Sequence, residues 1–316
     1  MNAVWIILGL AAVVGVTGYG LVRYALVFPL MHRPDASPRT PRHDQDPRMS
    51  ALRSHLNSVA TVPHNTHHYA ALELAADYIT GTLTAFGHMP ETQSFVVDGN
   101  TPVRNIVVCL KADPASSAQD VRADTIVIGA HYDSAGHSPG ANDNGTGVAA
   151  LLEICRDLVD YRPANRNVKL VFFVNEEAPY CKTPDMGSWR CAEMLIDRGE
   201  NIIGMMALET LGYFSDASGS QHFPFPFNHI YDDRGDFVAF VGLSRGRGFT
   251  HAATRAFRET QAFPSIGGIA PSFVSGIDLS DHWSFNAFGI PASMIVRVSE
   301  RRRIRDHQGR NAKRIK

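Results

Sequence analysis

Two patterns of apolar residues alternate along this chain. Between residues 69 and 86, apolar side chains recur every three or four positions, the spacing of one face of an α-helix, and Gly87 follows directly. Glycine commonly ends helices because it adopts a left-handed backbone without strain. The same spacing recurs over residues 147–159. We predict helices over both segments and over residues 190–198.

Short continuous apolar runs, rich in β-branched residues and bounded by turn-forming residues, separate these helices. Such runs are typical of buried strands. They cover residues 105–110, 125–130, 168–174, 205–208 and 291–296. Strands that alternate with helices predict an α/β domain, with a mixed, mostly parallel central sheet covered by helices on both faces.

The amino-terminal region differs from this domain. Residues 3–22 carry no charge, and about 20 apolar residues are enough to cross a membrane as a helix. Because residues 1–5 contain no lysine or arginine, an uncleaved anchor is favoured over a cleavable signal peptide. The next residues are rich in proline, arginine and aspartate, as linkers often are. We therefore expect an anchor or signal sequence over residues 1–28, a linker over 29–49, a catalytic domain over 50–296 and a basic tail over 297–316.

Composition restricts the classes of function. The chain has 316 residues, of which 44% are hydrophobic and 19% charged, as expected of a globular enzyme. Its formal net charge of −1 gives no overall attraction to nucleic acid. Four cysteines are too few for a disulfide scaffold, and they lack a CxxC zinc pattern. For Cys181 and Cys191, a local disulfide and two separate thiols both remain open.

Residues able to bind metals follow three of the predicted strands. In open α/β sheets, ligands bind beyond the carboxyl ends of the strands. The residues at those ends are His131, Asp133, Glu176, Glu177 and Glu209. A glycine-punctuated turn over residues 140–147 adds Asp143 directly before a predicted helix. Taken singly, each residue has an ordinary explanation as a helix cap, a solvated charge or a hydrogen-bonded histidine.

Taken together, these residues predict a metal site. Several carboxylates beside one imidazole at adjacent strand ends would be costly to bury unless cations neutralised them. Zinc accepts both imidazole nitrogen and carboxylate oxygen, and two zinc ions about 3.5–4 Å apart can share one carboxylate. Asp143 suits the bridging position, and Asp133 can accept the other N–H of the His131 ring. Glu176 and Glu177 are adjacent and should point in different directions, so that one binds metal while the other accepts a proton from water.

Five motifs occur in order along the chain: G-A-H-Y-D-S, A-N-D-N-G-T-G, N-E-E, L-E-T-L-G-Y and S-D-H-W-S-F. Their order and spacing resemble the two-zinc aminopeptidases, whose wider family includes glutamate carboxypeptidases and glutaminyl cyclases. The resemblance extends over residues 52–295 and is far more specific than a single motif.

The resemblance implies a role for each of these residues. One zinc would be held by His131 and Glu209, the other by Glu177 and a distal histidine, with Asp143 bridging both. Glu176 would be the general base, and Asp133 would orient His131. The peptide bond between residues 143 and 144 would be cis, as in that family.

The carboxyl-terminal region departs from the family. The expected D-T-A-x-Y-R-N-P-x-Y-H stretch, whose last histidine completes the second metal site, is unrecognisable here. His307 stands at that spacing, thirteen residues after Met294. It either completes the second zinc site or is a chance histidine in a basic tail.

Two further residues are candidates on the substrate side. His282, in the S-D-H segment, either contacts substrate or is a packed structural histidine. Tyr213 begins a loop rich in phenylalanine and proline, which we expect to shape the specificity pocket.

The sequence therefore predicts a zinc-dependent aminopeptidase with two ions per chain, acting on peptides or proteins that have a free amino terminus. The alternatives are a catalytically silent binding domain on the same fold and a glutaminyl cyclase or carboxypeptidase type of relative. We expect a single-pass membrane protein with its catalytic domain in the periplasm or outside the cell. The arginines after residue 22 favour the opposite orientation by the positive-inside rule.

Overall fold

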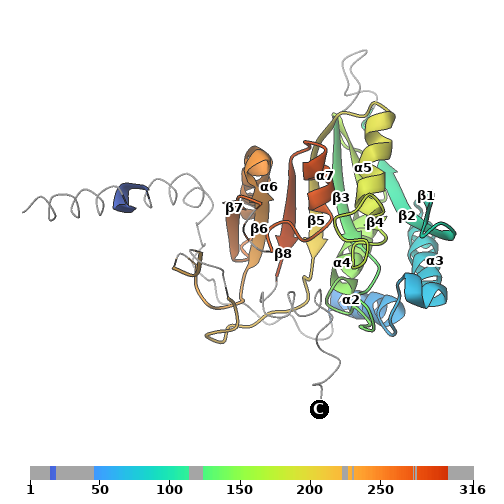
Figure 1. Cartoon of the computed structure of the whole chain (residues 1–316), viewed down its shortest axis with the longest axis horizontal. Coiled ribbons are helices and arrows are strands. Elements are labelled where there is room, and N and C mark those ends of the chain that lie inside the picture. Colours follow the sequence, from blue (N-terminus) through green and yellow to red (C-terminus); the bar gives the residue numbers. More distant parts are fainter. Residues whose placement is uncertain are drawn as a thin grey trace, which may run out of the picture.

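The computed structural model describes residues 15–18, 46–113, 124–222, 227–229, 231–272, 274 and 276–297. They form an eight-stranded sheet with helices on both faces (Figure 1). The strands are β1 (Glu91–Val97), β2 (Thr101–Leu110), β3 (Asp124–His131), β4 (Arg166–Phe173), β5 (Ile202–Glu209), β6 (Val238–Leu243), β7 (Ser265–Ala270) and β8 (Ala292–Val296). The α-helices are α2 (Pro47–Val59), α3 (Tyr69–Phe86), α4 (Gly145–Asp157), α5 (Gly187–Asp197), α6 (Arg247–Thr260) and α7 (His282–Ala287). Short 3₁₀ helices are η2 (Thr66–His68), η3 (Phe227–His229) and η4 (Ser244–Gly246).

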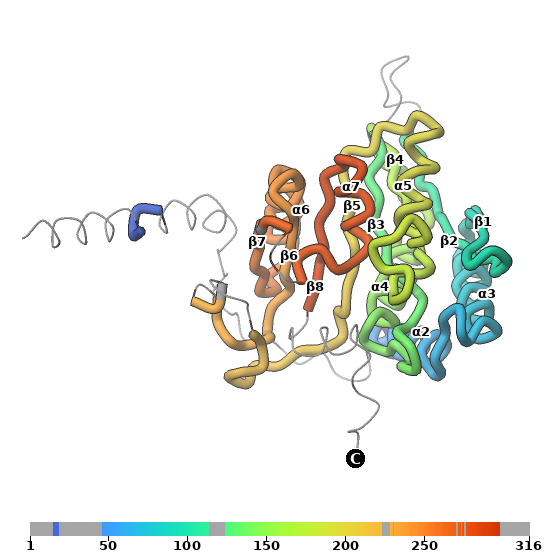
Figure 2. Tube along the Cα trace, in the orientation of Figure 1, coloured from blue at the N-terminus to red at the C-terminus, as the bar shows by residue number. Residues whose placement is uncertain are grey.

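The centre of the sheet is parallel and its edges are mixed. The strand order is β1-β2-β4-β3-β5-β8-β6-β7 (Figure 2). Strands β4, β3, β5 and β8 run parallel to one another, while β2 and β6 pair with this centre in the antiparallel sense. This confirms the predicted mixed, mostly parallel sheet. The carboxyl ends of β3, β4 and β5 consequently meet at one edge.

Helix α3 follows the apolar spacing that predicted it. Its buried residues are Leu72, Ala75, Ala76, Ile79 and Leu83, which lie on one face of the helix. Gly87 ends the helix with φ +103°, and its N–H donates to the carbonyls of Leu83 and Thr84. A left-handed residue at this position satisfies carbonyls that the last helical turn leaves unpaired.

Two hydrophobic clusters cover the two faces of the sheet. One cluster joins α2, α3 and α4 to the sheet and includes Ile79, Leu151 and Phe172. The other joins α5 and α7 to the opposite face and includes Leu195 and Phe285. The predicted covering of both faces by helices is therefore confirmed.

Several elements were not predicted from the apolar pattern, namely β1, β6, β7, α2, α6 and α7. Helix α2 begins at Pro47, where Asp46 caps it by accepting a hydrogen bond from the backbone N–H of Arg48. Helix α2 therefore begins inside the segment predicted to be a linker over residues 29–49.

The predicted anchor falls almost entirely outside the described residues. Within it, only residues 15–18 are described, and they are helical. None of the helices among the described residues has the length and apolar character needed to span a bilayer. The predicted basic tail also lies outside them, apart from Arg297.

Among the described residues, no disulfide joins Cys181 to Cys191. Cys191 is fully buried within α5, in the cluster that packs on the sheet, rather than in a loop beside Cys181. Burial raises the pKa of its thiol to about 12, because the charged thiolate is disfavoured away from water.

Candidate metal and catalytic site

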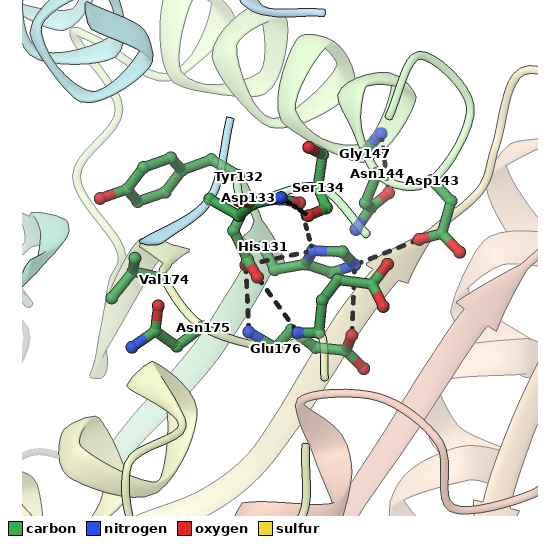
Figure 3. A network of polar contacts seen from close by, with 12 residues as sticks. His131, Tyr132, Asp133, Ser134, Asp143, Asn144, Gly147, Val174, Asn175 and Glu176 are labelled. Atoms are coloured by element: carbon green, nitrogen blue, oxygen red, sulfur yellow. Dashed lines mark hydrogen bonds and ion pairs between the residues drawn. The ribbon is translucent and has the colours of Figure 1, made fainter. Parts of the chain in front are cut away.

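The predicted ligands gather at the carboxyl edge of the central strands. His131 is the last residue of β3 and Glu209 the last of β5, while Glu176 and Glu177 directly follow β4. All four are buried, with exposed fractions between 0% and 2%. Asp143 approaches from the turn before α4, so that the ring of His131 lies among these carboxylates (Figure 3).

The distances between these groups are short. The Nε2 atom of His131 lies 3.2 Å from Asp143 Oδ1, 3.5 Å from Glu209 Oε1 and 3.8 Å from Glu176 Oε2. Two sets of donor atoms, each within 4.8 Å of one another, can be drawn from this cluster. They are His131 with Asp143 and Glu209, and His131 with Glu176 and Glu177.

These donor atoms fit a zinc ion. Nitrogen and oxygen ligands at about 2.0–2.2 Å from a tetrahedral zinc are separated from each other by roughly 3.4 Å. The His131 Nε2 atom is 3.2 Å and 3.5 Å from the nearest oxygens of Asp143 and Glu209. The second oxygen of Glu209 has no hydrogen-bond partner among the described residues. A cation between these atoms would satisfy buried groups that otherwise carry a desolvation cost.

The ring of His131 is held in the tautomer that a metal ligand needs. Its Nδ1 atom lies 3.1 Å from the backbone carbonyl of Asp133. A carbonyl can only accept, so Nδ1 carries a proton and Nε2 is the ring atom that is able to bind a metal.

The carboxylates also change the basicity of His131. Burial alone would lower the pKa of the imidazole. The negative charge of Glu176 and the hydrogen bonds of Asp133, Asp143 and Glu209 outweigh burial and raise the pKa well above its usual value. A proton and a metal ion therefore compete for the same Nε2 atom.

Asp133 has a wider role than the one predicted for it. Its carboxylate lies 3.5 Å from Nδ1 of His131, while its backbone carbonyl is the nearer partner of the ring. The two carboxylate oxygens instead accept the backbone N–H groups of Glu176 and Glu177, at 3.0 Å and 3.1 Å. Asp133 thus ties the end of β3 to the two glutamates that follow β4.

Two residues of the site were missed by sequence reasoning, although both stand in the S-D-H segment. The hydroxyl of Ser280 donates to Glu209 Oε1 at 2.6 Å. Asp281 is 1% exposed, and burial raises the pKa of its carboxyl to about 7. The repulsion between Asp281 and Glu209 acts in the same direction, while His131 opposes it. The S-D-H motif indicated that this segment lies near the site, but no local pattern distinguished Ser280 and Asp281 from the neighbouring His282.

The remaining predicted residues have different outcomes. His282 is fully buried at the start of α7, and its Nε2 lies 2.8 Å from the carbonyl of Ile277, as in a packed histidine. Tyr213 is 40% exposed, a few residues beyond Glu209. His307 lies outside the described residues. The peptide bond between Asp143 and Asn144 is cis, as the resemblance implied.

Comparisons with known proteins identify a family and a similar sequence. A family model described as peptidase family M28 matches residues 105–315. Uncharacterized protein YfbL of Escherichia coli is 34% identical over 271 residues, which cover 83% of this chain and 80% of YfbL.

Solved structures share the fold. The LapA aminopeptidase of Legionella pneumophila aligns with a TM-score of 0.57 at 16% identity, over 84% of this chain and 68% of LapA. A glutaminyl cyclase of Porphyromonas gingivalis aligns with a TM-score of 0.53 at 19% identity, over 80% of this chain and 83% of the cyclase. Since one fold carries both activities, the choice between them depends on the residues of the site.

Proposed function

This chain belongs to peptidase family M28 and is a hydrolase acting on peptide bonds, and we propose that it acts as a zinc-dependent aminopeptidase with two ions per chain. The observation that carries the proposal is the set of three donor atoms from His131, Asp143 and Glu209, whose separations suit one tetrahedral zinc.

The second ion would use the other side of the same cluster. Glu177 is buried and lies with Glu176 beside His131, within reach of a cation there. In the proposed arrangement Asp143 bridges the two ions, Glu177 binds the second, and His307 completes that site. Two neighbouring cations would also explain why so many carboxylates converge on one imidazole.

When bound, zinc would supply Lewis acidity, lowering the pKa of a water molecule and polarising the carbonyl of the scissile bond. Glu176 would accept the proton of that water; its carboxylate lies 3.8 Å from the His131 ring, and the residue is 1% exposed. The same carboxyl group would then protonate the departing amine. The backbone N–H of Glu176 donates to Asp133, and this hydrogen bond would orient Glu176 toward the water.

The test joins metal content to activity on the purified full-length chain. We expect about two zinc ions per chain by mass spectrometry, and hydrolysis of leucine p-nitroanilide that a chelator abolishes and added zinc restores. Glu176→Gln should keep the zinc and lose at least 100-fold in kcat, since it removes the base but no predicted ligand. A chain that binds zinc but only cyclises amino-terminal glutamine, or that turns over neither substrate, would contradict the proposal.

A further inference from the structure

The side chain of Asn144 ties together two segments that carry predicted zinc ligands. Asn144 is 1% exposed. Its Nδ2 donates to the carbonyl of Leu208 at 2.8 Å, and its Oδ1 accepts the backbone N–H of Thr210 at 3.1 Å. These two backbone groups stand immediately before and after Glu209. One amide therefore brackets the backbone of Glu209 from both sides.

Asn144 is also joined directly to Asp143, the predicted bridging ligand. The carboxylates of Asp143 and Glu209 both approach Nε2 of His131, at 3.2 Å and 3.5 Å. Like charges at such positions repel, so their separation has to be imposed by the surrounding structure. The Asn144 amide links the backbone at Asp143 directly to the backbone on either side of Glu209.

The backbone beyond Glu209 needs this support. Strand β5 ends at Glu209, and Thr210 then adopts φ +45°, a left-handed conformation that is uncommon for a residue other than glycine. The N–H of Thr210 finds its acceptor in the Asn144 side chain. Thr146 adds a second tie, because its hydroxyl donates to the carbonyl of Asn142 at 2.7 Å and accepts the N–H of Leu211 at 2.9 Å.

A simpler role for Asn144 is that of a helix cap. Its Oδ1 accepts the N–H of Gly147 at 3.1 Å, as expected of the residue before α4 (Figure 3). A cap alone, however, requires only one acceptor, and serine serves nearly as well as asparagine. It gives no reason for the bonds to both neighbours of Glu209.

We propose that Asn144 is a positioning residue that fixes the distance between Asp143 and Glu209 and thereby sets the affinity of this group for zinc. The inference rests on the proposed function, because it concerns the ligands assigned there. Residues that orient metal ligands typically change metal affinity by about 10–100-fold when they are replaced.

The test is zinc affinity, measured on the full-length chain by competition with a fluorescent chelator. Asn144→Ser keeps an acceptor for the Gly147 N–H but is too short to reach Leu208 and Thr210. We expect its zinc affinity to fall by about 10–100-fold. Asn105→Ser is the matched control, since Asn105 is equally buried and bonds to Gln93, Gly187 and Val174, none of them a predicted ligand.

If Asn144→Ser loses no more zinc affinity than Asn105→Ser, Asn144 acts only as a helix cap. The inference then fails, while the proposed function stands. Absence of zinc binding by the unsubstituted chain would overturn the proposed function as well. Where Asn144→Ser fails to fold, Thr146→Val removes the second tie between the same two segments, which joins Asn142 to Leu211. An unchanged zinc affinity in that variant would contradict the inference, and a several-fold loss would support it.

Discussion

The carboxylate of Asp133 accepts a hydrogen bond from the backbone N–H of Glu176, at 3.0 Å. Its other oxygen accepts the N–H of Glu177 in the same way. The residue expected to orient His131 therefore also orients the proposed base and a proposed ligand. A substitution of Asp133 should accordingly impair proton transfer by Glu176.

Asp133→Asn should separate these effects. The amide retains one acceptor but places an NH₂ group against a backbone N–H, so one of the two bonds is lost and two donors face each other. We expect kcat to fall by about 10–100-fold with KM changed little, because the base is misplaced while substrate binding persists. Zinc content should stay close to that of the unsubstituted chain. Loss of zinc in proportion to activity would show that Asp133 acts through the metal alone.

Replacing two glycines by alanine, one inside α3 and one directly after it, should change the stability of the fold in opposite directions. Gly87 has φ +103°, and an added Cβ would lie 3.3 Å from Val159, so Gly87→Ala should destabilise the fold by about 1 kcal/mol. Gly81 lies inside the same helix, with open space around it and no positive φ. Gly81→Ala should therefore stabilise by up to about 1 kcal/mol. Urea unfolding of both variants measures the difference, and equal signs would contradict the assigned helix end.

Apolar buried positions mark most of the elements that the sequence predicted, although β6, with the sequence VAFVGL, is equally apolar and was not predicted. Helix α3 was predicted with its observed bounds because its buried face consists of leucine, isoleucine and alanine. Helix α6 was missed because its buried residues include Thr250 and Thr254, which hydropathy does not mark. Strand β7 was missed because its sequence, SIGGIA, is short and centred on two glycines.

Local sequence patterns also explain which residues of the site were predicted. His131 and Glu209 were predicted because they end apolar strands, and the topology of the sheet then brings them together. Asp281 was not predicted, because nothing local to the S-D-H segment indicates that its carboxyl is buried beside Glu209. Such burial arises from packing between distant segments, which a local pattern cannot encode.

Zinc binding should release protons near neutral pH. Without a metal, the surrounding carboxylates raise the pKa of His131 well above its usual value, and a cation on Nε2 must displace that proton. Zinc affinity should therefore fall as pH falls through the raised pKa, by up to about tenfold per pH unit. Calorimetric titration at pH 7, in buffers with different enthalpies of ionisation, counts the protons released.

Glu209→Gln is the companion variant for this measurement. It removes one of the charges that raise the pKa of His131, so fewer protons should be released from the ring on binding. A release of zero protons by the unsubstituted chain would mean that His131 is already neutral and would contradict the electrostatic argument.

Asp281 makes the stability of the metal-free protein depend on pH. Burial raises the pKa of its carboxyl from 3.8 to about 7, so the folded chain holds a proton there that the unfolded chain releases above pH 4. The stability that this proton contributes is complete below pH 4 and is lost as the pH rises through 7. Ionised Asp281 would then add a buried charge beside Glu209, which a bound cation would offset.

Asp281→Asn keeps the shape of the side chain and removes its ionisation. In the metal-free protein we expect the Tm of this variant to exceed that of the unsubstituted chain by several degrees at pH 8, by less at pH 5, and not at all below pH 4. Asp278→Asn is the control, because Asp278 pairs with Lys182 at 2.8 Å and its removal should lower Tm slightly at both values. Adding zinc should shrink the advantage of Asp281→Asn at pH 8, since the cation stabilises the ionised carboxyl of the unsubstituted chain. An advantage that is equal at pH 5 and pH 8 would indicate better packing rather than a removed charge.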